Sequence, residues 1–154
     1  MIFVDSYRPF MFIGEYQHSV DPKKRLALPS KFRKELGTRV VVTRGLDKCL
    51  FVYPIKTWKD LAEKLGTLPM GEASTRSFVR LMLAGAVDSD VDNQGRILLP
   101  DYLKEYAGLD RSVTVAGLFN RLEIWDEQSW KTYRNKAEEN SAEVAEQLGK
   151  LGIY

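Results

Sequence analysis

The sequence predicts an α+β fold, a β core with flanking helices, built from two copies of one unit. One short phrase occurs twice: Asp-Pro-Lys-Lys-Arg-Leu-Ala-Leu-Pro at 21–29 and Asp-Asn-Gln-Gly-Arg-Ile-Leu-Leu-Pro at 92–100. Each copy is followed by a short helical pattern, a glycine, a β-rich stretch and longer helical patterns. The interval is 92 − 21 = 71 residues, about half of the 154-residue chain, which indicates a duplicated unit rather than a short solenoid repeat.

Further matched positions support the duplication. The matches divide the chain into an N-terminal extension over 1–10, a first unit over 11–83 and a second unit over 84–154, which we expect to form one globular body. The interval is 71 for the first five pairs and 72 for the last two: Gly14 with Gly85, Val20 with Val91, Phe32 with Leu103, Leu36 with Ala107, Gly37 with Gly108, Gly45 with Gly117, and Trp58 with Trp130.

The composition describes an ordinary globular protein with no membrane span. Hydrophobic residues make up 44% of the chain and charged residues 29%. No apolar run approaches the ~20 residues that a spanning helix needs. Cys49 is the only cysteine, so an internal disulfide is impossible and a reducing compartment is expected. The apolar start is interrupted by Asp5 and Arg8, which does not fit a signal peptide.

The first unit is expected to begin with a strand, and both units are expected to contain a tight turn. Residues 12–20 are typical of a strand, and Asp21 followed by Pro22 favours a type I turn. The fourth turn position of the second copy is Gly95, which suits a hairpin loop with a glycine bulge. The first copy has Lys24 there, and a left-handed backbone at a lysine costs about 1 kcal/mol.

Short buried strands and brief helices follow the turns. The apolar runs 26–28 and 97–99 each end at a proline. Ser30 and Asp101 are expected to cap the helices that follow, and Gly37 is expected to end the first of them.

Two hairpins and four longer helices complete the expected elements. Asp126 is expected to cap the third long helix, and Asn140 with Glu143 has the spacing of a capping box for the last. We interpret the tryptophans on these helices as core anchors rather than platforms for a ligand. The hairpins pair 40–43 with 50–53 and 113–115 with 122–125; the helices cover about 55–65, 72–83, the residues after 126, and the residues after 140 through about 148, with a linker over 66–71.

Positive charge is concentrated in the first unit. Residues 21–44 contain eight basic and two acidic residues, a balance of 8 − 2 = +6, whereas 92–117 has a balance of 3 − 4 = −1. Such a cluster suits either a solvated surface or a polyanion such as nucleic acid. The eight basic residues are Lys23, Lys24, Arg25, Lys31, Arg33, Lys34, Arg39 and Arg44.

The sequence lacks the residue sets of an enzyme, a metal site or a cofactor site. His18 is the only histidine and lies in a strand-like run, where a packing or surface role is expected. No phosphate-binding loop, nucleophile elbow, zinc-protease motif or dinucleotide fingerprint is present. Asp21 and Asp92 are better explained as first residues of turns than as paired acids, because their carboxylates can accept hydrogen bonds from turn N–H groups.

Arg25 and Arg96 allow two interpretations. Each lies four residues after its aspartate, so each could form a salt bridge that closes the turn, worth about 0–1 kcal/mol when exposed. Alternatively, the turn presents the guanidinium outward, where it could bind phosphate or the guanine edge. The sequence leaves both open.

The doubled D-x-x-x-R phrase, followed by L-A-L-P or I-L-L-P and a short helix, resembles the MraZ family of tandem SpoVT/AbrB-type repeats. The resemblance covers about residues 11–148. It implies a swapped-hairpin β-barrel shared by two internal repeats, in a cytoplasmic, nucleoid-associated transcription regulator without enzymatic activity. It further implies a ring-shaped homo-oligomer that binds repeated boxes in double-stranded promoter DNA and usually represses the division and cell-wall gene cluster, including its own promoter.

The expected DNA-binding residues combine the family motif with the basic cluster. The motif maps onto Asp21, Arg25, Asp92 and Arg96, with Lys24 departing from the usual glycine. To these we add the cations Lys23, Lys24, Lys31 and Arg33. Neutralising about four phosphates predicts a slope of log K against log salt near −3.6 per engaged subunit. We expect no recognition helix, no membrane partner, no cofactor and no small-molecule substrate; the alternatives are an AbrB-like antitoxin and an oligomeric scaffold that ignores nucleic acid.

Overall fold

A six-stranded antiparallel sheet carries the fold in the computed structural model, which describes residues 11–153. Its strand order is β1-β7-β8-β4-β3-β5, and β2 and β6 form a separate two-stranded ribbon. The expected extension over 1–10 lies outside the described residues. The strands are β1 (Phe12–Ser19), β2 (Arg25–Ala27), β3 (Arg39–Arg44), β4 (Leu50–Pro54), β5 (Val87–Asp90), β6 (Arg96–Leu98), β7 (Ser112–Phe119) and β8 (Leu122–Asp126).

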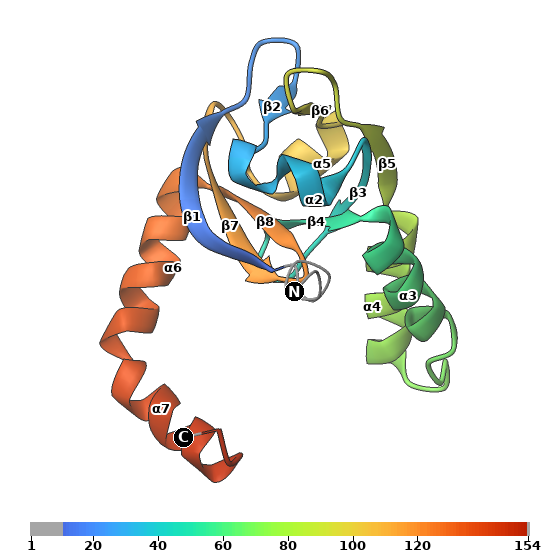
Figure 1. Ribbon diagram of the computed structural model, residues 1–154. Helices are drawn as coiled ribbons and strands as arrows, with labels where there is room; N and C mark the ends of the chain where they lie inside the picture. Colours follow the sequence, from blue (N-terminus) through green and yellow to red (C-terminus); the bar gives the residue numbers. More distant parts are fainter. Residues whose placement is uncertain (1–10, 154) are drawn as a thin grey trace, which may run out of the picture.

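The two repeats exchange strands. β1 of the first repeat pairs with β7 of the second, and β5 of the second pairs with β3 of the first. The ribbon takes β2 from one repeat and β6 from the other. The α+β class built from two repeats is therefore confirmed. In the described residues the ladder ends at β1 and β5 instead of closing, and the ribbon with its short helices lies between those edge strands (Figure 1).

Short helices cover the ribbon side of the sheet, and longer helices form two projections from the other side (Figure 1). The short ones carry one buried apolar residue each, namely Phe32, Leu36 and Leu103. The helices are η1 (Ser30–Phe32), α2 (Arg33–Leu36), α3 (Ile55–Gly66), α4 (Ala73–Ala84), α5 (Asp101–Tyr106), α6 (Glu127–Glu139) and α7 (Ser141–Lys150).

Two apolar clusters hold these layers together. The larger cluster joins the sheet to the ribbon and short helices, with Leu26 of β2 and Ile97 of β6 at 0% and 1% exposure. The smaller cluster lies where the long helices meet the sheet and contains Trp125, with Trp58 and Trp130 packed against it. The tryptophans therefore act as core anchors, as the helical spacing predicts.

Two of the expected helix caps, Ser30 and Asp101, are wrong. Pro29 and Pro100 occupy the N-cap positions, and Ser30 and Asp101 are already the first helical residues. Each proline fixes φ near the value of a cap residue and takes the cap position itself, so both helices begin one residue earlier than expected. Asn140 does occupy the N-cap position of α7 and is also the C-cap of α6, but its side chain makes no cap bond.

The other two terminal residues behave as predicted. The Asp126 carboxylate accepts the Ser129 N–H at 2.9 Å, and Gly37 ends α2 with φ of 76°. The first contact is a usual side-chain cap at a helix start, and the second position needs a positive φ that glycine adopts freely.

The second helical projection is less buried than the first. In the first, α4 buries Val79 and Met82. Its counterpart α7 buries no residue, and α6 and α7 together extend away from the sheet (Figure 1). Within residues 11–153, no helix combines the length and the apolar character that a bilayer crossing demands.

Candidate nucleic-acid interface

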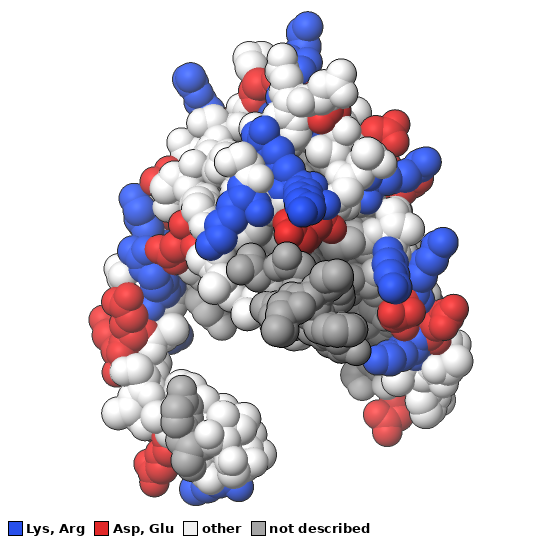
Figure 2. Space-filling model, viewed as in Figure 1, with Lys and Arg blue, Asp and Glu red and all other residues white. Residues whose placement is uncertain are grey.

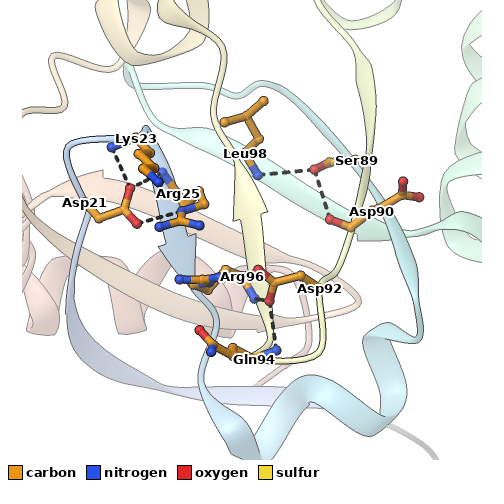
Figure 3. Close-up of polar contacts among 9 residues, drawn as sticks. All are labelled: Asp21, Lys23, Arg25, Ser89, Asp90, Asp92, Gln94, Arg96 and Leu98. Atoms are coloured by element: carbon orange, nitrogen blue, oxygen red, sulfur yellow. Dashed lines mark hydrogen bonds and ion pairs between the residues drawn. The ribbon is translucent and has the colours of Figure 1, made fainter.

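Each repeated phrase forms a tight turn organised by its aspartate. In the first turn, one Asp21 oxygen accepts the backbone N–H groups of Lys23 at 2.9 Å and Arg25 at 2.8 Å. The other oxygen accepts Arg25 Nε at 2.8 Å. The second turn repeats this pattern, with Asp92 bound to the backbone of Gln94 and Arg96 and to Arg96 Nε (Figure 3). The aspartates are therefore turn-forming groups, as the sequence predicts.

These hydrogen bonds favour the charged form of both carboxyl groups. The backbone N–H of Arg25 is the main cause that lowers the pKa of Asp21, and its side chain adds to the effect. The backbone N–H of Arg96 does the same to the pKa of Asp92. Both aspartates are consequently anionic at neutral pH and hold the arginine beside them.

The salt bridge and the outward presentation of the arginines occur together. Arg25 and Arg96 each use Nε to bind their own aspartate. Their side chains remain 32% and 27% exposed, and within residues 11–153 no acceptor bonds to their Nη atoms. The aspartate thus fixes the guanidinium while leaving its outer edge available for a planar acceptor.

Strand pairing brings the two arginines onto one face. In the ribbon, Arg25 lies opposite Leu98 and Ala27 lies opposite Arg96. Because paired residues share a face, the two arginines are diagonal neighbours, about 7–8 Å apart between backbones. Figure 3 shows them on adjacent strands, each beside its aspartate. The opposite face of the ribbon is buried in the core.

Positive-φ residues link each turn to the other repeat. Lys24 has φ of 64° and Gly95 has φ of 75°, which confirms the left-handed position in both turns. The carbonyl of Lys24 accepts the Leu99 N–H at 2.8 Å, and the carbonyl of Gly95 accepts the Leu28 N–H at 2.9 Å. Each turn is therefore hydrogen-bonded to the backbone of the other repeat.

Arg33 lies against the second turn although it belongs to the first repeat. A Cβ atom built on Gly95 would overlap the Arg33 guanidinium stem. Arg33 Nε also donates to the Leu28 carbonyl at 3.1 Å. Glycine suits this position because it adopts the positive φ without cost and leaves room for the close approach of Arg33.

The first turn has its own neighbours from the second repeat. Lys24 Nζ binds the Asp101 carboxylate at 2.7 Å, and Lys104 adds to the lowering of the Asp101 pKa. Lys104 is the 71-residue counterpart of Arg33. A surface groove beside this turn is lined by Ser19, Val20, Asp21, Pro22, Lys24, Lys104, Asp110 and Arg111.

The other basic residues of the 21–44 cluster lie at several different places in the structure. Lys23 and Lys31 are exposed, at the first turn and on η1. Figure 2 shows basic side chains projecting around the end of the molecule that carries the turns and over the short helices, with acidic groups between them. Arg39 instead pairs with Asp88 on β5. Arg44 lies over the rings of Tyr102 and Tyr106.

The charge balance of each sequence repeat therefore does not give the distribution of charge around the turns. Arg39 and Arg44 contact residues away from the turns. Arg33 lies against the turn of the second repeat, although it belongs to the first. Sequence reasoning also missed Lys104, Arg111 and Leu98, which strand exchange brings to the site. The signal that could have found Lys104 is its match to Arg33 at the repeat interval.

The other chemically active residues lie outside this surface. Cys49 is buried, and burial strongly raises the pKa of its thiol. His18 is partly buried in β1, as a packing residue would be. Within residues 11–153, no three His, Cys, Asp or Glu side chains are grouped so that they could hold a metal ion.

Comparison with known proteins identifies the family. The family model described as the antitoxin-like MraZ protein matches the chain twice, over residues 11–81 and 82–151. The chain is 47% identical over 143 residues to a protein of Acetivibrio thermocellus named transcriptional regulator MraZ, covering 93% of this chain and 100% of that protein. A protein of the same name from Desulfitobacterium hafniense is 49% identical with the same coverage, and one from Carboxydothermus hydrogenoformans is 48% identical over 90% of this chain and 96% of its own length. Two tandem matches and nearly full-length relatives establish that the chain belongs to the MraZ family.

Proposed function

We propose that the protein is a DNA-binding transcription regulator whose contact surface is the exposed face of the β2–β6 ribbon. The observation that carries this proposal is the placement of Arg25 and Arg96 as diagonal neighbours on that face, each oriented by an aspartate. The names of the relatives support the same function.

The ribbon has the dimensions and chemistry for groove readout. A two-stranded β-ribbon fits the major groove of B-DNA, and a guanidinium edge can bind O6 and N7 of guanine bidentately. Lys23, Lys24, Lys31 and Arg33 surround the ribbon and would bind phosphates. The short helices are unsuited to this role because their apolar faces are buried.

The finer parts of the function follow from the family resemblance. We propose that the protein represses the division and cell-wall gene cluster and its own promoter by binding repeated short boxes. It would act in the cytoplasm on the nucleoid. A ring of subunits would engage successive boxes, so that a weak single contact gains affinity through effective concentration.

The exposed helix α7 supports assembly with further copies of the chain. Ala137, Ser141, Val144, Ala145 and Leu148 line a shallow apolar groove along the second helical projection. Leu151 and Ile153 beyond it are also exposed. The counterpart helix α4 is packed within the same chain, so α7 presents an apolar side that a second copy would cover.

A mobility-shift titration with the DNA upstream of the protein's own gene tests the function. Arg25→Ala should weaken binding by about five- to 150-fold, because one bidentate base contact contributes about 1–3 kcal/mol. Arg80→Ala on the exposed side of α4 is the matched control. Loss of the folded circular dichroism spectrum in Arg25→Ala, or unchanged binding by it, would count against the proposal.

An antitoxin role is the second candidate, since the family model carries the description antitoxin-like. Antitoxins of the AbrB type usually end in a disordered toxin-binding tail. Residues 127–150 here form α6 and α7 instead. A purified oligomer that ignores duplex DNA but neutralises a toxin encoded beside it would favour this candidate, and one that does neither would favour a scaffold.

A further inference from the structure

Leu98 is an exposed apolar residue at the centre of the proposed contact surface. It lies directly opposite Arg25 in the ribbon and two residues from Arg96 on the same strand, so all three share one face. Its exposed fraction is 54%, whereas its strand neighbours Ile97 and Leu99 are at 1% and 0%. The Leu98 side chain therefore lies outside the core to which those two neighbours belong.

The first repeat has no equivalent of this group. The position that corresponds to Leu98 is Ala27, since 98 − 27 = 71, and Ala27 lies on the same ribbon face. The backbone at Leu98 is bound from the side by Ser89 of β5, whose hydroxyl accepts the Leu98 N–H at 3.4 Å (Figure 3). The ribbon therefore presents two arginines and a single bulky apolar side chain.

We propose that Leu98 contacts the C5-methyl group of a thymine in the major groove and so determines part of the sequence specificity. This inference rests on the proposed function. Among the four bases, thymine alone presents a methyl group in the major groove, and apolar side chains are its usual contacts. A ribbon inserted there with Arg25 and Arg96 on guanine edges places Leu98 against the neighbouring base.

Because Leu98 and Ala27 differ in size, the contact surface would bind a DNA site in one preferred orientation. Two similar turns with one arginine each could bind a site in either orientation. One methyl contact on the second repeat distinguishes the two orientations, because only one of them sets Leu98 against thymine.

Replacing thymine by deoxyuridine tests this contact. Deoxyuridine keeps the O4 acceptor and the base pairing of thymine and lacks only the methyl group. The upstream duplex is prepared with either base, and the affinities of the wild-type protein, Leu98→Ala and Leu68→Ala are compared. Leu68 is the matched control because it is an exposed leucine on the loop between α3 and α4.

Wild-type protein and Leu68→Ala should bind the thymine duplex about three- to fivefold more tightly than the deoxyuridine duplex, as expected for one buried methyl. Leu98→Ala should bind both duplexes equally, at the wild-type affinity for deoxyuridine. An unchanged thymine preference in Leu98→Ala, or a change in its oligomer size, would overturn the assignment of Leu98. Absence of any DNA binding by the wild-type protein would instead refute the proposed function.

Discussion

Asp21 and Asp92 connect the formation of the turns to the presentation of the arginines. Each carboxylate accepts two backbone N–H groups and one guanidinium N–H. A charged group at this position therefore does two tasks, fixing the backbone and orienting a side chain that would bind DNA. This residue-level arrangement makes its own prediction about pH.

Carboxyl titrations followed by NMR should give Asp21 and Asp92 midpoints below the ordinary value of about 3.9. Since the folded-state pKa is lowered, the stabilisation from each aspartate is present above about pH 4 and is lost as the pH falls through the lower, folded-state value. Arg25→Ala should raise the Asp21 midpoint part of the way, because the backbone N–H bond remains. An equal rise at Asp92 would contradict this local cause.

Lys24 tolerates a left-handed backbone that glycine would adopt freely. Lys24→Gly should be more stable than Lys24→Ala by about 1 kcal/mol, because alanine keeps the cost of the left-handed conformation. Both variants lose the same ion pair with Asp101, so the comparison isolates the backbone effect. Urea denaturation measures the difference, and equal stabilities would show that the backbone changes in the variants.

At the scale of elements, local sequence patterns predicted the hairpins and several helix ends, which depend on neighbouring residues. They did not predict the order of the strands, which depends on contacts between residues far apart in the sequence. The strand over 12–20, both hairpins and the helix ends at Asp126 and Gly37 follow from alternation and capping chemistry, whereas β5 was not expected. The order of strands could not be read from these patterns, because β1 and β5 pair with the other repeat. The exchange of strands was expected only from the resemblance to the MraZ family.

The alignment of the repeats was also imperfect within the hairpins. Arg44 faces Leu50 and Gly117 faces Leu122, so Gly117 corresponds to Arg44 rather than to Gly45. The connection before β7 is longer than its counterpart, and the following hairpin loop is shorter. Matching the two glycines concealed both changes, since a residue type carries no information on strand register.

The same limit applies to the candidate site. The D-x-x-x-R spacing predicted both turns, but only strand register shows that Arg25 and Arg96 share a face with Leu98. The position of Arg33 beside the second turn likewise depends on the packing of one repeat against the other.

Gly95→Ala tests the contact of Arg33 with the second turn. The variant should lose about 2 kcal/mol, from the left-handed conformation and from displacing Arg33 off the Leu28 carbonyl. Gly108→Ala is the matched control, with φ of 60° and open space around it, and should lose only about 1 kcal/mol. In an Arg33→Ala background the cost of Gly95→Ala should fall to that of the control. A cost independent of Arg33 would disprove the coupling.

At the scale of the whole molecule, the ribbon and the second helical projection extend in different directions from the sheet (Figure 1). One end carries the arginines, and α7 carries an apolar side without a partner in the chain. This separation would let subunits assemble through the helices while their ribbons remain free for DNA.

The double variant Val144→Glu, Leu148→Glu should therefore reduce the oligomer size measured by light scattering, because it places charge on the apolar side of α7. Glu143→Gln on the same helix is the control and should leave the size unchanged. An unaltered oligomer in the double variant would exclude this surface from assembly.

The dependence of DNA affinity on salt is the most direct test of the claim that the arginine-bearing ribbon and its surrounding cations contact DNA. For the wild-type protein, log K should fall with log salt at a slope near −3.6 per engaged subunit, as expected for about four neutralised phosphates. Lys23→Gln should make the slope shallower by about 0.9, because one phosphate contact is removed. A wild-type slope near zero would contradict the account.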